Sequence, residues 1–445
     1  MINPRTIAQK AAIADISTQA AQLKNQQTEL DNESSGLDTL STALSDFQSA
    51  IDGLNSDTDG PLTFSATSSN DADTITADST AQAGTYSFYV DQLAQAQQTT
   101  FTMADNQIAA TSGETITLTM GEGDSQTEMT IDLSDTDSDG DGMVDAKGLV
   151  NAINSSDENP GVTATLVQTD EGTAVMLTSD TTGAASAFSV HSSDASLDAT
   201  MNGGSTTSAQ DAQIRLNGTS DTSTGMVITS STNTFDDVIP GVSLTFSEVS
   251  TDEPVSFTVA EDTSGTQDKV QTFVDAYNTL VDTLDSLTSM GTDGSASGVF
   301  AGDAGIKSLS SQMDNIIHAT YYDDNGNPVS IVDYGITLDS DGHLEIDSDQ
   351  FSAAMEENPE GLTALFVGDD SMVAQLDDLM TSYTDSNSGI IASRQQSIDD
   401  QQSKIDDKAD QLKETYNTNY DRYVAEYTNT LTQVYIMKVS MAAFA

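Results

Sequence analysis

The sequence predicts an α+β protein: long coiled-coil-like helices at both chain ends form a stalk, and an antiparallel β head of one or two domains is inserted between them. Three observations support this prediction. Large apolar residues recur every seven residues near each end, short alternating segments fill residues 62–260, and Gly, Asn, Asp and Ser separate those segments. Helices and strands that occupy separate stretches of the chain are typical of the α+β class.

The N-terminal helix is expected over residues 5–54. A heptad row runs through it, formed by Ile16, Leu23, Leu30, Leu37, Leu44 and Ile51. A second apolar row, which completes a coiled-coil seam, is present only from residue 37 onward. We therefore expect residues 37–54 to form the firm part of this helix, whereas residues 1–36 are marginal alone because short amphipathic helices need a partner.

The C-terminal residues 391–445 repeat the pattern, and their heptad row continues into a tyrosine stripe. The expected seam residues here are Ile398, Ile405, Leu412, Tyr416 and Tyr420. Two interpretations are open for the whole seam. It holds the stalk of a single copy together, which we favour for residues 37–54, or it contacts other subunits or the filament, which we favour for residues 1–36 and 413–445.

The domain organisation follows from these elements. We expect an N-terminal helix, partly disordered, over residues 1–44 and a helical leg domain from residues 45–70 plus 263–390. An inner β domain takes residues 71–100 plus 206–262, an outer β domain takes residues 101–205, and residues 391–445 form the C-terminal coiled-coil helix. A stripe of apolar residues over 264–290 and a turn at Asp341-Gly342 are the clearest features of the leg domain.

Charge and composition exclude several classes of function. The chain has 13 basic and 71 acidic residues, so its net charge is 13 − 71 = −58. Nucleic acids and anionic membranes would repel such a surface, and we expect neither as a partner. No stretch of about 18 apolar residues is present to span a membrane, and no apolar run follows the first residues to suggest a cleaved signal peptide. Without cysteine the chain can form no disulfide.

No pattern in the sequence indicates an enzyme or a cofactor. The histidines His191, His318 and His343 lie far apart, and phosphate-binding and nucleophile motifs are missing. The aspartates Asp135, Asp137 and Asp139 resemble the start of a calcium-binding loop. The twelfth position of that loop is Ala146 rather than a bidentate glutamate, so these aspartates are a candidate only for a weak calcium site and we expect no resident metal.

An ordered series of short motifs resembles the flagellar cap family, that is, the filament-capping proteins called flagellar hook-associated protein 2. Residues 84–96 read GTYSFYVDQLAQA, residues 212–218 read AQIRLNG and residues 239–244 read IPGVSL. Residues 273–278 read FVDAYN, and YGIT at residues 334–337 is followed by DGHLEID at residues 341–347. The resemblance covers nearly the whole chain. The acidity and the apolar C-terminus depart from it, a departure that fits a cap of a lateral flagellar system.

The resemblance implies a set of partners and a location. Such proteins leave the cell through the flagellar type III export channel without a cleaved signal and act outside, at the distal tip of the filament. They form a homo-oligomeric ring of about five copies that promotes flagellin insertion and folding and prevents loss of monomers. Flagellin, the hook–filament junction protein and an export chaperone at the C-terminal helix are the expected partners.

Alternative functions remain open from the sequence. Flagellin or a junction protein would also place coiled termini around a variable β head, although the FVDAYN and YGIT segments favour the cap. An extracellular adhesin is a further alternative, since a β head is a common scaffold for cell adhesion. The chain has no tryptophan to form a carbohydrate-binding platform.

Overall fold

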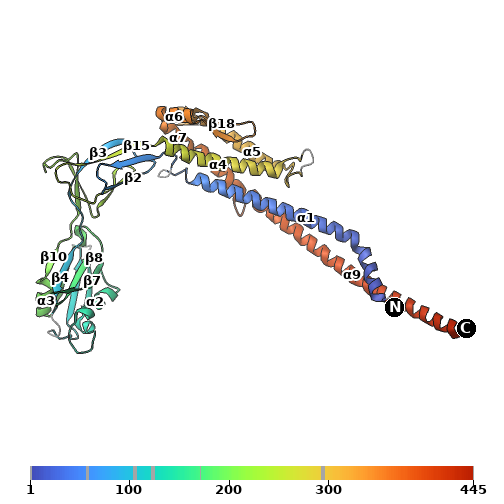
Figure 1. The fold of residues 1–445 in the computed structure, drawn as a ribbon, viewed down its shortest axis with the longest axis horizontal. Coiled ribbons are helices and arrows are strands. Elements are labelled where there is room, and N and C mark those ends of the chain that lie inside the picture. The colour runs from blue at the N-terminus through green and yellow to red at the C-terminus, as the bar shows by residue number, and fades with distance from the viewer. Residues whose placement is uncertain are drawn as a thin grey trace. The chain divides into compact units, whose positions relative to one another are not determined.

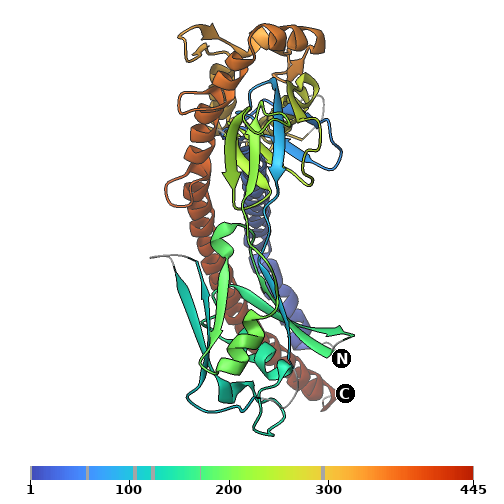
Figure 2. The same ribbon diagram turned by 90° about the vertical axis from the view of Figure 1, so that its left-hand side faces the viewer.

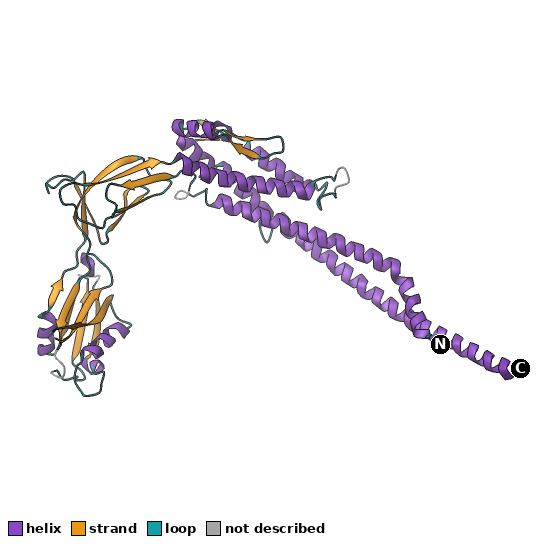
Figure 3. Cartoon of the chain, viewed as in Figure 1, coloured by secondary structure: helices purple, strands orange, loops and turns teal. Residues whose placement is uncertain are grey.

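The computed structural model describes residues 3–56, 60–103, 108–121, 126–170, 172–291 and 296–443. It divides into two compact units. The helical unit comprises residues 1–62 and 263–445, and the β unit comprises residues 63–262. Both chain ends therefore build one unit, and the other is a single continuous insertion. Helices predominate in the first and strands in the second (Figure 3).

Two long helices, α1 (Pro4–Asp52) and α9 (Ile390–Ala443), lie side by side in the helical unit (Figure 1). Asn3 caps α1 by accepting a hydrogen bond from the Arg5 backbone, and Pro4 opens its first turn, where a missing N–H costs nothing. The expected boundary at residue 44 falls inside this continuous helix. Among the described helices, none combines the length and the apolar character that a membrane crossing requires.

The rest of the helical unit packs against the C-terminal half of α1 and the first turns of α9. It consists of α4 (Thr263–Thr288), α5 (Ala304–Ile317), β16 (Tyr321–Tyr322), β17 (Pro328–Val329), η4 (Ile331–Tyr334), β18 (Ile336–Leu338), β19 (Leu344–Ile346), α6 (Ser348–Glu357), α7 (Pro359–Phe366) and α8 (Met372–Thr384). The hairpin predicted at Asp341-Gly342 is the β18–β19 pair, and Gly342 adopts the positive φ of 86° that its turn requires.

The core of the helical unit is built from α1, α4 and the short helices. Phe47 of α1 contacts Phe273 and Tyr277 of α4, with ring centroids 6.1 and 6.2 Å apart, and Phe366 of α7 meets Phe273 edge-on at 5.4 Å. Such tilted and edge-on aromatic contacts are the favoured geometries. This core is continuous with the seam residues of the inner stalk.

The β unit contains two groups of antiparallel strands, each with its own hydrophobic core (Figure 1, Figure 2). The inner group forms sheets in the orders β1-β15-β3-β11-β12 and β13-β14-β2. Its strands are β1 (Phe64–Ser68), β2 (Thr74–Ala77), β3 (Gly84–Gln92), β11 (Ala212–Leu216), β12 (Met226–Ser230), β13 (Thr234–Ile239), β14 (Val242–Thr245) and β15 (Val255–Glu261).

The outer group forms sheets in the orders β10-β4-β8-β7 and β6-β5-β9. Its elements are β4 (Gln98–Thr102), β5 (Thr115–Met120), β6 (Thr127–Asp132), η2 (Leu133–Thr136), α2 (Ala146–Ser155), β7 (Val162–Thr169), β8 (Gly172–Ser179), η3 (Ala184–Ser186), β9 (Phe188–Ser192), α3 (Ala195–Asn202) and β10 (Ser205–Thr207). Gln97 joins its two sheets, because its amide exchanges hydrogen bonds with the backbone N–H and carbonyl of Phe188.

The α+β class predicted from the sequence is confirmed. The strand boundaries differ from the expected domain limits in three places. Strand β1, expected in the leg domain, pairs with β15 in the inner sheet. Strands β4 and β10 cross the expected limits at residues 100 and 205, and both belong wholly to the outer group, where they pair with each other.

Candidate assembly site

The seam residues between positions 37 and 51, which we call the inner seam, are buried inside the helical unit. Leu37, Leu44 and Ile51 pack in its core, and Gln48 of α1 donates hydrogen bonds to Asp377 and Thr381 of α8. These positions therefore hold together the stalk of one copy. A loop residue, Phe300, closes on α1 at Gly36, where a Cβ would stand 3.2 Å from the Phe300 ring. Glycine at this helical position is what lets the ring approach so closely.

An ion pair fixes α9 to the same region. Arg394 of α9 makes a bidentate contact with Asp303, with atoms 2.7 and 2.8 Å apart, and its guanidinium lies over the Phe300 ring. Asp303 also caps α5 by accepting from the backbone of Gly305 and Ile306. The hydrogen bond from Arg394 is the main cause that lowers the pKa of Asp303 below its ordinary value.

Further out, α1 and α9 pair with each other in antiparallel register. Leu30, Ile398 and Ile405 are buried there, and Gln27 and Gln402 hydrogen bond across the pair. Asp15 of α1 contacts three residues in the second half of α9. It accepts hydrogen bonds from Tyr423 at 2.8 Å and Asn419 at 3.3 Å, and the Arg422 guanidinium lies 3.8 Å away.

The seam residues before position 30 in α1 and after position 405 in α9 form the outer seam, where the two helices leave an apolar groove between them. The groove has a volume of about 690 Å³, and we call it the stalk groove. Its apolar lining consists of Ile16, Ala20, Leu23, Ile405, Ala409, Leu412 and Tyr416. The seam residues Ile16, Leu23, Leu412, Tyr416 and Tyr420 are only half-buried. Tyr416 and Tyr420 stack with centroids 6.1 Å apart. The expected seam therefore exists along the stalk, but its outer half is incompletely covered.

Two features of the outer stalk were missed by the heptad pattern. Ala8 and Ala12 are fully buried, whereas Ile13, which continues the seam spacing from Ile16, is 48 % exposed. The buried row thus steps by four residues at this end instead of alternating three and four, which is a local break in the heptad. Small residues carry no signal in a search for large apolar ones, although a four-residue repeat of alanine is visible in the sequence.

The C-terminal part of α9 exposes a run of large apolar side chains. The exposed fraction is 50 % for Val434, 58 % for Ile436 and 74 % for Met441, and Tyr435, Met437 and Val439 are also exposed. We call residues Val434–Met441 the C-terminal segment. The sequence analysis favours contact with other subunits or the filament for residues 413–445. The C-terminal segment is the most exposed part of this range.

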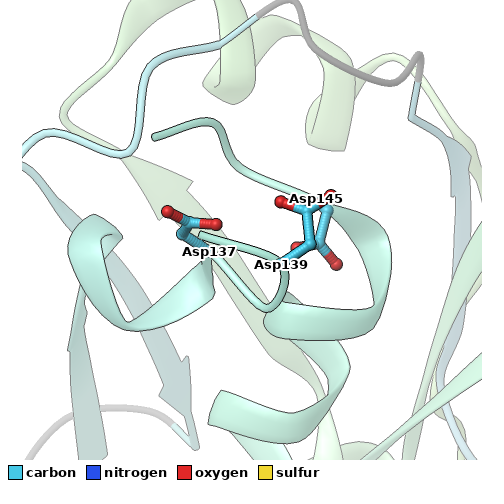
Figure 4. A group of neighbouring side chains, drawn as sticks. All are labelled: Asp137, Asp139 and Asp145. Carbon is cyan, nitrogen blue, oxygen red and sulfur yellow. The ribbon is translucent and has the colours of Figure 1, made fainter. Parts of the chain in front are cut away.

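The candidate calcium loop lies in the outer part of the β unit. The structure brings Asp137 and Asp139 within 4.8 Å of Asp145, rather than of Asp135, which lies in η2 (Figure 4). The loop already uses these carboxylates. Asp137 accepts from the backbone of Gly140 and Gly142, with the Gly142 bond the main cause of its lowered pKa, and Asp145 caps α2 through the Gly148 N–H. Hydrogen bonds to the backbone therefore explain why Asp137 and Asp145 lie in this loop.

Comparison with known proteins matches both ends of this architecture. The profile of the flagellar hook-associated protein 2 N-terminus matches residues 2–97, and that of the flagellar hook-associated protein 2 C-terminus matches residues 209–437. The chain is 30 % identical over 389 residues to the lateral flagellar hook-associated protein 2 of Vibrio parahaemolyticus, covering 83 % of each chain. It is also 30 % identical over 403 residues to flagellar hook-associated protein 2 of Escherichia coli K12, covering 85 % of this chain and 81 % of that one.

A solved structure agrees with the sequence matches. The D1-D2-D3 domains of the flagellar cap protein FliD from Escherichia coli superpose with a TM-score of 0.67 at 29 % identity, covering 82 % of this chain and 99 % of that one. The chain therefore belongs to the flagellar hook-associated protein 2 family.

Proposed function

We propose that this protein is a flagellar filament cap: a homo-oligomer at the distal filament tip that promotes flagellin insertion and folding and prevents loss of monomers. Membership of the flagellar hook-associated protein 2 family and likeness to the flagellar cap protein FliD support this function. The names of the matched proteins do not favour the alternatives of an adhesin, a flagellin or a junction protein.

The observation that supports this function best within the structure is the contrast along the stalk. The inner seam is buried in the helical unit, whereas the outer seam and the C-terminal segment leave apolar side chains exposed. An exposed apolar surface of this kind is typical of a protein that works in an assembly. We assign the outer stalk to contacts with neighbouring copies and with flagellin, and the inner stalk to the stability of each copy.

The proposed working state needs no catalysis. Flagellin would fold beneath the cap, and burial of its own apolar surface supplies the free energy for insertion. The remaining partners proposed for the exposed stalk are the hook–filament junction protein, met before the filament grows, and an export chaperone that covers the C-terminal helix before secretion. A ring of about five copies is the proposed stoichiometry, with closed cyclic symmetry. Export through the flagellar type III channel is proposed as the route.

Gene deletion tests the proposal directly. We expect the deletion strain to lose swimming or swarming and to shed monomeric flagellin into the medium, and we expect the full chain, supplied in trans, to restore both. The strain should carry one flagellar system, so that no second cap compensates. Normal motility with intact filaments in the deletion strain would reject the cap function and favour the adhesin.

A further inference from the structure

The outer stalk has an incomplete core. Of the seam residues that line the stalk groove, Leu23 and Leu412 are only half-buried, whereas Ile405, at the end of the groove nearer the core, is buried. Leu30, one heptad beyond Leu23, is buried as well. Two helices alone cover only part of the surface of such residues. A third apolar helix lying in the groove would complete their burial, as in a small helical bundle.

The C-terminal segment has the character of that third helix. It is continuous with α9, and its exposed side chains point in every direction around the helix axis, since Val434, Tyr435, Ile436 and Met437 follow one another. A helix that is apolar all round is normally buried against other protein. The segment and the groove are thus two incompletely covered apolar surfaces of the same chain.

Charge favours this segment over other parts of the chain. The net charge is −58, so most surfaces of a second copy would bring carboxylates toward the groove. No aspartate or glutamate follows Glu426, and Lys438 is the one charged side chain of the segment. The groove is bordered by Asp31 and Asp406 and also by Lys24 and Lys413, so its rim is close to neutral and does not repel a segment whose one charged side chain is Lys438.

The segment cannot fill the groove of its own copy. Tyr416, at one end of the groove, and Val434 lie on the same helix. At 1.5 Å of rise per residue, a separation of 18 positions along the helix holds the two about 27 Å apart. A contact between groove and segment must therefore join two copies.

We propose that the C-terminal segment of one copy docks in the stalk groove of a neighbouring copy. This contact is heterologous, because a segment on one copy meets a different surface on the next, and such contacts close into rings when the rotation allows. The inference deepens the proposed function by naming an intersubunit contact of the cap, and it rests on that function for its role in the ring.

Cysteine cross-linking tests the contact without disturbing the fold, because the natural chain has no cysteine. Purified full-length Leu23→Cys and Met437→Cys proteins are mixed at 1:1 under oxidising conditions in salt high enough to screen repulsion. Lys24→Cys is a second groove probe at a polar position, and Asn25→Cys, on the exposed side of α1, is the matched control. Docking raises the local thiol concentration, so we expect the Leu23–Met437 disulfide at least roughly tenfold above the Asn25–Met437 product.

Three results would overturn the inference. The first is an equal disulfide yield with Leu23→Cys and Asn25→Cys. The second is a predominant Met437–Met437 product, which would show that two C-terminal segments pair with each other. The third is the formation of oligomers without a disulfide between the groove and the C-terminal segment. Motility separates the inference from the cap function. If the cysteine variants restore swimming but form no disulfide between the groove and the C-terminal segment, the proposed contact is rejected and the cap function stands. A deletion strain that swims normally, alongside a strong disulfide, would reject the cap function and leave the contact standing.

Discussion

Gln27 and Gln402 form a reciprocal pair of hydrogen bonds between α1 and α9. Each side-chain amide donates to the carbonyl oxygen of the other, at 2.7 and 3.0 Å, although the residues lie 375 positions apart in the chain. Both are half-buried among apolar seam residues. A polar pair at a seam position favours one register, because a slipped register would break both hydrogen bonds between the helices and leave each amide only its bond to an aspartate of its own helix, Asp31 or Asp406.

Gln402→Ala should therefore loosen the outer stalk. The substitution removes both hydrogen bonds and leaves the Gln27 amide without this partner, for an expected loss of about 1–2 kcal/mol. Hydrogen exchange of the backbone amides of α9 around residue 402 measures it. Gln401→Ala, at the adjacent exposed position, is the control and should leave protection unchanged. Equal protection in the two variants would show that the pair does not stabilise the stalk.

Leu37→Ala should destabilise the helical unit strongly. The side chain is 1 % exposed in the core, and truncation of such a leucine costs about 2–5 kcal/mol. Ile13→Ala on the same helix is the control, since its half-exposed side chain should cost less than about 1 kcal/mol. Denaturant unfolding followed by helical circular dichroism measures both. Similar losses at the two positions would contradict the assignment of Leu37 to the core of the unit.

Arg394→Gln should lower the free energy of unfolding of the helical unit below that of the natural chain. This loss should be larger at neutral pH than at acid pH. The folded-state pKa of Asp303 is lowered by Arg394, so the contribution is complete above the ordinary aspartate value, near 4, and is lost as the pH falls toward the folded value. The stability difference between the two proteins should therefore shrink below about pH 4. Unfolding curves recorded over this range measure it.

Arg422→Gln provides the comparison for that experiment. Its ion pair with Asp15 is longer, and its side chain is half-exposed, so the effect at any pH should be small. A pH-independent loss in Arg394→Gln would indicate that the stacking on Phe300, rather than the ion pair, stabilises this contact.

Asp145→Ala should destabilise the outer part of the β unit by about 0.5–2 kcal/mol, because it removes the N-cap of α2. Asp135→Ala, at an exposed position of the neighbouring η2, should have little effect. Thermal unfolding of the two variants gives the comparison. Equal melting temperatures would show that the α2 cap contributes nothing measurable.

Removal of residues 1–36 and 413–445 together should spare folding of the β unit and abolish capping. The β unit has its own cores, and the deleted residues belong to the helical unit. Restoration of motility in the deletion strain by the shortened chain would reject the assignment of these ends to assembly. Folding of the β unit is checked independently by the dispersion of its amide resonances.

The sequence was most informative where burial follows periodicity. Leu37, Leu44 and Ile51 are large, regularly spaced and buried by neighbours of their own copy, so the heptad predicts them well. The pattern fails at Ala12 and Ile13 because what is buried there depends on how closely two helices approach. Strand β13 gives only a weak pattern, because Asp236 and Asp237 interrupt its apolar alternation, and its pairing with β14 contains a register shift.

The aspartate loop shows a second limit of linear patterns. Counting along the chain groups Asp135 with Asp137 and Asp139, as a calcium loop would require. In the structure, Gly140 and Gly142 adopt positive φ and turn the chain, so Asp145 takes the third place. Spacing in sequence predicts neighbours only where the backbone is regular, and a pair of left-handed glycines removes that regularity.

The pairing of α1 with α9 also sets an order of events in folding. The β unit is one uninterrupted stretch and can fold once residues 63–262 are available. The helical unit needs both chain ends, and contacts across hundreds of residues form slowly because a long loop must close first. A chain that emerges from a narrow channel in either direction would therefore carry a folded β unit before its stalk can close, and the last segment released would complete the molecule.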